Sequence, residues 1–186
     1  MEPRPLAAFP RAAAAAVHTV FADIDDTLTT DGRLTAQAYG AIEALRAAGL
    51  RVVPVTGRPA GWCDHIARMW PVDAVIGENG AFWMWHDDRA GKLQARHLLD
   101  DAGRADFARR LAAVRERVLR EVPGCATASD QFCRLYDLAI DFREDVAPLP
   151  PASVDLIVAL MRDAGMNAKV SSIHVNGWFG DWDKLS

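Results

Sequence analysis

The sequence predicts an α/β protein whose parallel-sheet core carries an inserted α+β module. Two observations lead to this prediction. Over residues 17–81, short apolar strands alternate with helices, an order typical of βαβ units with right-handed crossovers. After Ala81 the alternation stops, and strand pairs surround two longer helices. The 186 residues suit one domain of ~150 residues with an added module.

Composition and charge argue against several classes of protein. With 51% hydrophobic and 25% charged residues, the chain has the profile of a globular protein rather than of a disordered or fibrous one. Its net charge of −4 argues against a sequence-independent nucleic-acid binder. No stretch reaches the ~18 apolar residues that cross a bilayer, so we expect no membrane partner. The three cysteines lack CxxC spacing, which favours a reducing cytoplasm over a disulfide framework or a zinc site.

The core is expected to begin after residues 1–16, a segment rich in alanine and proline that we interpret as a flexible leader. Thr35 is a candidate helix N-cap and Gly49 a candidate helix stop. We expect the core elements in the order strand 18–23, helix 35–48, strand 51–56, helix 60–70 and strand 73–77. Together they form the first half of the core, residues 17–81.

The inserted module is expected to span residues 82–177. We expect, in order, strands at 82–86 and 92–97, a helix over 104–121, a strand over 131–142, a helix over 151–164 and a closing hairpin at 168–177. Residues 178–186 then return to the core. A core sheet of three strands leaves an exposed edge, so we expect either further sequence to complete the core or a second copy of the chain to cover that edge.

The most informative cluster is Asp23-Ile24-Asp25-Asp26-Thr27, directly after the first strand. Ligands of parallel α/β sheets bind beyond the carboxyl ends of the strands, and alternate positions let Asp23 and Asp25 face one cavity. Such oxygen ligands suit Mg²⁺. A metal there would keep Asp23 an ionised nucleophile, and a protonated Asp25 could donate to a leaving oxygen and later accept a proton from water. The alternative is a turn in which the aspartates only cap the backbone.

A second polar group follows the next strand. The hydroxyl of Thr56 and the amides of Gly57 and Arg58 would form a phosphate cradle at a helix start, and the Arg58 guanidinium would add a fork of donors. The same residues also suit an ordinary strand–turn–helix junction. Lys184 would stabilise negative charge beside two carboxylates and a phosphate, although a single lysine is usually a solvated charge.

These residues together resemble the haloacid dehalogenase superfamily of aspartyl-phosphate phosphohydrolases. Residues 23–27 resemble its first motif, hhhDxDxT, residues 55–59 its second, and Asp183-Lys184 its third. The segment IGENGA at 76–81 is similar to the NGA segment that precedes the large cap in the subclass of sugar-phosphate phosphatases. The fourth motif, an acidic GDxxND-type loop, would follow the lysine, and the sequence ends at Ser186 before such a loop.

The resemblance implies a Rossmannoid core, incomplete at its C-terminal end, with an inserted α+β cap. It implies Asp23 as nucleophile, Asp25 as acid and base, Thr56 and Lys184 as phosphate-binding groups, and Mg²⁺ as cofactor, held by Asp23 and Asp25. The expected function is hydrolysis of a small phosphorylated sugar or polyol. A phosphotransferase or mutase using the same nucleophile, and a truncated binding module without catalysis, remain as alternatives.

The residues that would select the substrate are the least determined. Asn79 lies in the NGA segment, while Arg134, His174 and Asn176 are candidates from the module. A hairpin that returns to the core would present His174 and Asn176 to sugar hydroxyls. Alternatively, Arg134 is a solvated strand residue, and the other polar groups serve packing or solvation.

Overall fold

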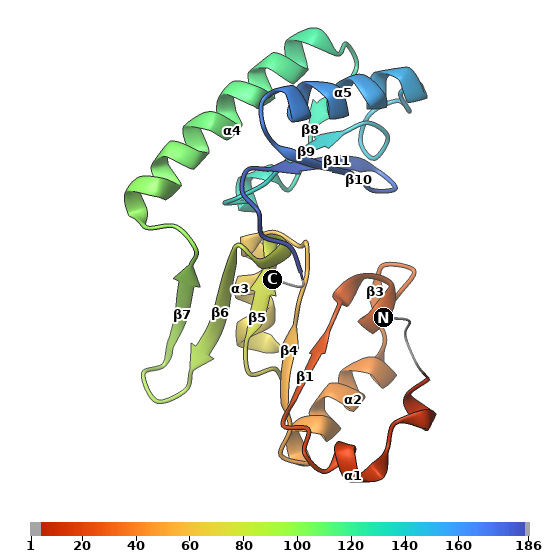
Figure 1. The fold of residues 1–186 in the computed structure, drawn as a ribbon, viewed down its shortest axis with the longest axis vertical. Helices are drawn as coiled ribbons and strands as arrows, with labels where there is room; N and C mark the ends of the chain where they lie inside the picture. Colours follow the sequence, from red (N-terminus) through yellow and green to blue (C-terminus); the bar gives the residue numbers. More distant parts are fainter. Residues whose placement is uncertain (1–4, 185–186) are drawn as a thin grey trace.

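The protein folds as two units stacked end to end, shown in Figure 1 for a computed structural model that describes residues 5–184. We call residues 17–97 the core unit and residues 101–178 the cap unit. Two connections join them, one at residues 98–100 and one at residues 179–183. The second connection brings the end of the chain back to the core unit (Figure 1).

The core unit consists of a sheet of five strands, β1, β4, β5, β6 and β7, with a separate β2–β3 hairpin and with helices beside the sheet. Its elements are β1 (Thr19–Ala22), η2 (Ile24–Leu28), β2 (Thr29–Thr30), β3 (Arg33–Leu34), α2 (Ala36–Ala47), β4 (Arg51–Pro54), α3 (Ala60–Met69), β5 (Val75–Gly77), η3 (Glu78–Gly80), β6 (Phe82–Asp87) and β7 (Lys92–His97). Strands β1 and β4 pair in parallel, a parallel bridge between Val55 and Ile76 joins β4 to β5, and β5, β6 and β7 pair in antiparallel fashion. The α/β fold class is therefore confirmed.

The cap unit is an antiparallel sheet covered by two helices. Its elements are α4 (Asp101–Glu121), β8 (Ala126–Thr127), η4 (Gln131–Cys133), β9 (Leu138–Asp141), α5 (Pro151–Asp163), β10 (Asn167–Val170) and β11 (His174–Trp178). The strand order is β10-β11-β9-β8. Both helices lie on the side of this sheet that faces away from the core unit (Figure 1), and buried Met161 of α5 lies against Gly177 of β11.

Strands β6 and β7 continue the core sheet. The strand pairing therefore favours a boundary between the units near residues 98–100, where the expectation from sequence put it after Ala81. The sequence signal at Ala81 was a change of strand direction. An antiparallel hairpin can extend a parallel sheet without leaving it, so a change of direction does not mark a new domain.

The expected strand over 131–142 is wrong in its first half. Only Leu138–Asp141 form a strand, and Gln131–Cys133 form a 3₁₀ turn. The physical reason is a tertiary one: the backbone amides of residues 135–137 donate to the carboxylate of Glu78 rather than to a neighbouring strand.

The β2–β3 hairpin was not expected, although the sequence holds a signal for it. Asp31 and Gly32 both have positive φ, 49° and 71°, and an Asp-Gly pair in this conformation is a common two-residue hairpin turn. Within the expected leader, the structure has two short helical segments, η1 (Leu6–Ala8) and α1 (Arg11–Ala14). None of the helices described in residues 5–184 has the length and apolar character needed to span a bilayer.

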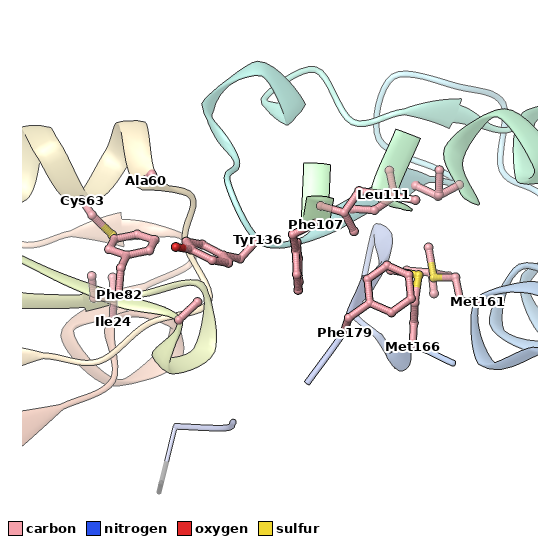
Figure 2. Close-up of a cluster of buried hydrophobic side chains, with 14 of the residues drawn as sticks. Ile24, Ala60, Cys63, Phe82, Phe107, Leu111, Tyr136, Met161, Met166 and Phe179 are labelled. Atoms are coloured by element: carbon pink, nitrogen blue, oxygen red, sulfur yellow. The ribbon is translucent and has the colours of Figure 1, made fainter. Parts of the chain in front are cut away.

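Aromatic side chains link the hydrophobic interiors of the two units. Phe82 of the core unit lies 6.2 Å, between ring centroids, from Tyr136 of the cap unit. Tyr136 in turn lies 5.5 Å from Phe107 of α4, which contacts Phe179 of the returning connection at the same distance. Figure 2 shows these rings in a row between the units, so the two units share one hydrophobic core.

Candidate active site

The acidic loop lies at the carboxyl end of β1, as the sequence predicted. Asp23 Oδ1 accepts a 2.8 Å hydrogen bond from the amide of Ile24. Beyond it the chain turns at Asp26, whose φ is 58°, and Thr29 closes the turn by donating its hydroxyl to the carbonyl of Ile24. The side chains of Asp23 and Asp25 remain 38% and 43% exposed. Both carboxylates are therefore accessible to a ligand.

The second predicted group meets the first one. The hydroxyl of Thr56, which is fully buried, accepts from the amide of Arg58 at 3.0 Å. The Arg58 guanidinium binds the carboxylate of Asp25, with Nη2 2.6 Å from Oδ1 and Nε 3.2 Å from both oxygens. The parallel pairing of β1 and β4 puts their carboxyl ends side by side, which is why residues more than thirty positions apart meet here.

The third predicted group, Lys184, also reaches the acidic loop. Its Nζ lies 2.5 Å from Oδ2 of Asp23. Gly80 makes this approach feasible: its φ is 114°, and a Cβ at this position would lie 2.7 Å from the carbonyl oxygen of Asp183. The chain before Lys184 therefore passes directly over the Asn79-Gly80 turn, and only glycine leaves room for it.

Asn79 is held beside the phosphate loop, which we define as Thr56-Gly57-Arg58. Its amide donates to the carbonyl of Thr56 at 3.0 Å, and a Cβ on Gly57 would lie 3.1 Å from the Asn79 side-chain oxygen. Asn79 is itself in the left-handed region, with φ 60°. The structure thus brings Asn79 next to the groups predicted to bind phosphate.

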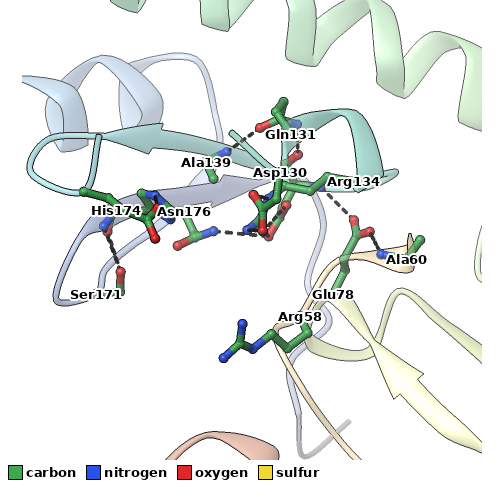
Figure 3. Close-up of polar contacts among 12 residues, drawn as sticks. Arg58, Ala60, Glu78, Asp130, Gln131, Arg134, Ala139, Ser171, His174 and Asn176 are labelled. Carbon is green, nitrogen blue, oxygen red and sulfur yellow. Dashed lines mark hydrogen bonds and ion pairs between the residues drawn. The ribbon is translucent and has the colours of Figure 1, made fainter. Parts of the chain in front are cut away.

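The three candidate substrate residues of the cap unit are held in different ways. Arg134 is only 6% exposed and forms ion pairs of 2.9 Å with both Asp130 and Asp137. Asn176 donates to Asp137 at 3.4 Å. His174 is the first residue of β11 (Figure 3). Its Nε2 lies 2.8 Å from a carboxylate oxygen of Glu144. An arginine buried between two carboxylates fits a structural role better than contact with a substrate.

The sequence did not predict the contacts of two residues near the site, Trp62 and Glu78. Trp62, on the first turn of α3, lies under the Arg58 guanidinium, 4.6 Å from guanidinium carbon to ring centroid; this is the geometry of a cation–π contact. Glu78 is fully buried, and its carboxylate bonds to both units. Burial, followed by the charge of Asp137, raises the pKa of Glu78 to about 8, and its backbone donors partly offset this shift. The only sequence signal for a buried role of Glu78 was the presence of this charged residue inside the short, apolar and glycine-containing segment 75–81.

The donor set suits a hard divalent cation. Asp23 offers an accessible carboxylate, and Mg²⁺ usually takes one or two carboxylates and keeps several waters. Among the described residues 5–184, no cluster of three or more carboxylate, histidine or cysteine side chains forms a complete cage. The residues present therefore fit a metal bound mainly through Asp23 and through water or substrate oxygens.

Comparisons with known proteins bear on this site. A family model described as haloacid dehalogenase-like hydrolase matches residues 20–112, a range that contains the acidic loop, the phosphate loop and Glu78. No curated protein matches the chain.

Several solved structures share the fold. A protein from Thermoplasma acidophilum has a TM-score of 0.67 at 18% identity, over 90% of this chain and 67% of that one. A trehalose-6-phosphate phosphatase related protein has a TM-score of 0.59 at 18% identity, over 89% and 69% of the two chains. A subclass IIB sugar phosphatase of the same superfamily has a TM-score of 0.54 at 14% identity, over 90% and 72%. At these identities the likeness shows the fold alone.

Proposed function

The chain belongs to the haloacid dehalogenase-like hydrolases, and from this premise we propose that it is a Mg²⁺-dependent phosphomonoesterase acting on a small phosphorylated sugar or polyol. The observation that carries the proposal is the pairing of two accessible aspartates with two cations at one edge of the core sheet. Asp23 is bound by Lys184, and Asp25 by Arg58. A phosphate monoester would exchange these internal ion pairs for contacts to its own oxygens.

Asp23 is the proposed nucleophile. One of its carboxylate oxygens attacks phosphorus and forms an aspartyl phosphate, while the bond from phosphorus to the leaving oxygen breaks. Asp25, protonated at that moment, gives its proton to the leaving oxygen. In the second step a water gives a proton to Asp25 and attacks phosphorus, which releases phosphate and restores the Asp23 carboxylate.

The cationic groups would bind the transferred phosphoryl group. We assign Lys184 Nζ and the Thr56 hydroxyl to the phosphoryl oxygens, together with the amides of Gly57 and Arg58. The Arg58 guanidinium has to move from Asp25 toward the substrate, because a protonated Asp25 no longer binds it strongly. Positive charge fixed in this way stabilises the charge that develops in the transition state.

Mg²⁺ would be held by the carboxylate of Asp23 and the backbone carbonyl of Asp25, where it would neutralise the negative charge of nucleophile and phosphate. For the sugar or polyol part we assign Asn79, His174 and Asn176, the polar residues that face the site from η3 or lie on β11. Two of the solved structures with this fold are described as a sugar phosphatase and a trehalose-6-phosphate phosphatase related protein, which supports the substrate class.

The Asp23→Asn variant tests the proposal. We expect phosphate release from a hexose 6-phosphate with Mg²⁺ to fall by at least ~10³-fold, because an amide cannot attack phosphorus. Asp31→Asn is a matched control: Asp31 sits at the tip of the β2–β3 hairpin with φ 49°, which asparagine tolerates, and we expect wild-type rates. Retained turnover in Asp23→Asn would remove this residue as nucleophile. Lack of phosphate release by the wild-type chain would contradict the proposal and favour a binding module.

A further inference from the structure

Glu78 bonds to both units of the protein at once. From the core unit, the amide of Ala60 donates to Oε1 at 3.0 Å. From the cap unit, three successive amides donate to the same carboxylate: Leu135 to Oε1 at 2.9 Å, Tyr136 to Oε2 at 2.5 Å and Asp137 to Oε2 at 3.1 Å. Figure 3 shows Glu78 between Ala60 and the cap segment. The side chain therefore crosslinks the units through backbone groups.

This placement is costly for the fold. Glu78 is 1% exposed and its φ is 45°, and a buried carboxylate is tolerated only when donors surround it. Nothing in the packing alone calls for a carboxylate here, since an apolar residue of similar size would fill the same volume. What the carboxylate adds is two acceptor oxygens: Oε1 accepts from Ala60 of the core unit and from Leu135 of the cap unit, and Oε2 accepts from Tyr136 and Asp137 of the cap unit.

On the core side, Glu78 is tied to the phosphate loop. Ala60 is the first residue of α3, and only Pro59 separates it from the loop. The amide of Glu78 donates to the carbonyl of Arg58 at 3.2 Å, and the amide of Asn79 to that of Thr56. The position of the carboxylate is therefore set by the same loop that is proposed to bind phosphate.

On the cap side, the bonded amides lead to β11. Asp137 is fully buried; it receives Arg134 in an ion pair and Asn176 in a hydrogen bond. Asn176 lies in the middle of β11, the strand proposed above to contact the sugar. A continuous set of polar contacts thus runs from the phosphate loop through Glu78 and Asp137 to Asn176.

We infer that Glu78 is a positioning residue that holds the 135–137 segment of the cap unit at a fixed place relative to the phosphate loop, and so sets where β11 meets the leaving group of the substrate. This inference rests on the proposed function. It predicts that loss of the crosslink affects large leaving groups, which reach the cap unit, more than small ones, which do not.

The Glu78→Gln substitution removes some of the hydrogen bonds of the crosslink with little change of side-chain volume. One carboxylate oxygen becomes an NH₂ group, which cannot accept a hydrogen bond. If the remaining oxygen stays in the Oε1 position, the amides of Tyr136 and Asp137 lose their acceptor; if it takes the Oε2 position, Ala60 loses its own. Assays at about pH 9, above the pKa of Glu78, compare the ionised carboxylate with the amide.

Asp141→Asn is the matched control. Asp141 is also 1% exposed, and it accepts from three backbone amides, those of Arg143, Glu144 and Asp145. All three donors belong to the cap unit itself. The two variants thus remove contacts of the same kind, and only one of them removes contacts between the units.

The readouts are kcat/KM for glucose 6-phosphate relative to acetyl phosphate, and hydrogen exchange of Ala60 and of residues 135–137. In Glu78→Gln we expect the kcat/KM ratio to fall ~10-fold and exchange to accelerate ~10-fold either at Tyr136 and Asp137 or at Ala60, the scale of one lost bond to a charged group. In Asp141→Asn we expect both to stay within about two-fold. An unchanged ratio in Glu78→Gln, or the same fall in Asp141→Asn, would overturn the inference.

If the wild-type chain hydrolyses neither substrate, the proposed function fails and exchange alone decides the inference. Faster exchange at Ala60 or at residues 135–137 in Glu78→Gln but not in Asp141→Asn then supports the crosslink. Unchanged exchange at all of these amides in Glu78→Gln overturns it.

Discussion

The ion pair between Arg58 and Asp25 joins two residues to which the proposed reaction gives different roles. The guanidinium of Arg58 makes three contacts to the carboxylate of Asp25, which is the proposed acid. The pair is 29% and 43% exposed, so its contribution to folding stability is small. The ion pair matters for the proposed reaction, in which Arg58 leaves Asp25 and binds the substrate.

Asp25→Asn is expected to lower kcat by ~10²–10⁴, the usual contribution of acid–base catalysis. The free energy of unfolding should change by less than ~1 kcal/mol, because the lost ion pair is partly exposed to solvent. Phosphate release and urea unfolding measure the two effects. Asp26→Asn is the neighbouring control, since Asp26 has φ 58° and asparagine accepts that conformation. Equal kcat losses in both variants would contradict a specific role for Asp25.

At the scale of elements, the site depends on η3 passing beneath the returning connection. Gly80 has a positive φ, and a Cβ added to it would lie 2.7 Å from the carbonyl oxygen of Asp183. A side chain here would push residues 182–184 outward, and Lys184 would lose its 2.5 Å contact with Asp23. The geometry of this one turn therefore controls the contact between Lys184 and Asp23, which we propose to be catalytic.

Gly80→Ala is expected to lower phosphate release by ~10-fold or more, because a phosphate-binding cation leaves the site. Gly91→Ala is the control for backbone strain alone: its φ is also positive, at 61°, but no atom lies within 4 Å of the added Cβ. Both variants should lose ~1 kcal/mol of unfolding free energy from strain, and only Gly80→Ala should lose activity. Equal activity in the two variants would show that Lys184 does not depend on this passage.

At the scale of the whole molecule, the two units share a row of aromatic rings. Phe107 contacts Tyr136, Phe179 and Trp182, which belong to the cap unit and to the connection that returns from it. Tyr136 continues the row to Phe82 of the core unit. The same ring contacts therefore stabilise the cap unit and hold it in place against the core unit.

Phe107→Ala is expected to lower the free energy of unfolding by about 3–5 kcal/mol, through lost burial and the cavity that remains. Urea unfolding measures this change. Leu119→Ala on the same helix is the control, because Leu119 is exposed; its effect should stay within about 0.5 kcal/mol. A loss below ~1 kcal/mol in Phe107→Ala would mean that the ring row does not stabilise the junction.

The sequence by itself determined the parts of this protein that depend on local pattern. Alternating apolar segments and caps specified the core helices and strands, as in the helix that begins after Thr35. The position of polar residues after β1 and β4 predicted that Asp23 and Asp25 would lie close to Thr56 and Arg58, because parallel pairing aligns the ends of neighbouring strands. Belonging to the haloacid dehalogenase-like hydrolases followed from the same short motifs.

Only the tertiary structure decided what depends on contacts between distant segments. The crosslink from Glu78 to residues 135–137 arises where the two units meet, and no periodicity along the chain records such a meeting. The same crosslink turned the expected strand over 131–142 into a turn and a shorter strand. The local sequence pattern determines the backbone hydrogen bonds within a helix or strand. Backbone groups outside helices and strands take their hydrogen-bond partners from segments that only the tertiary fold brings near.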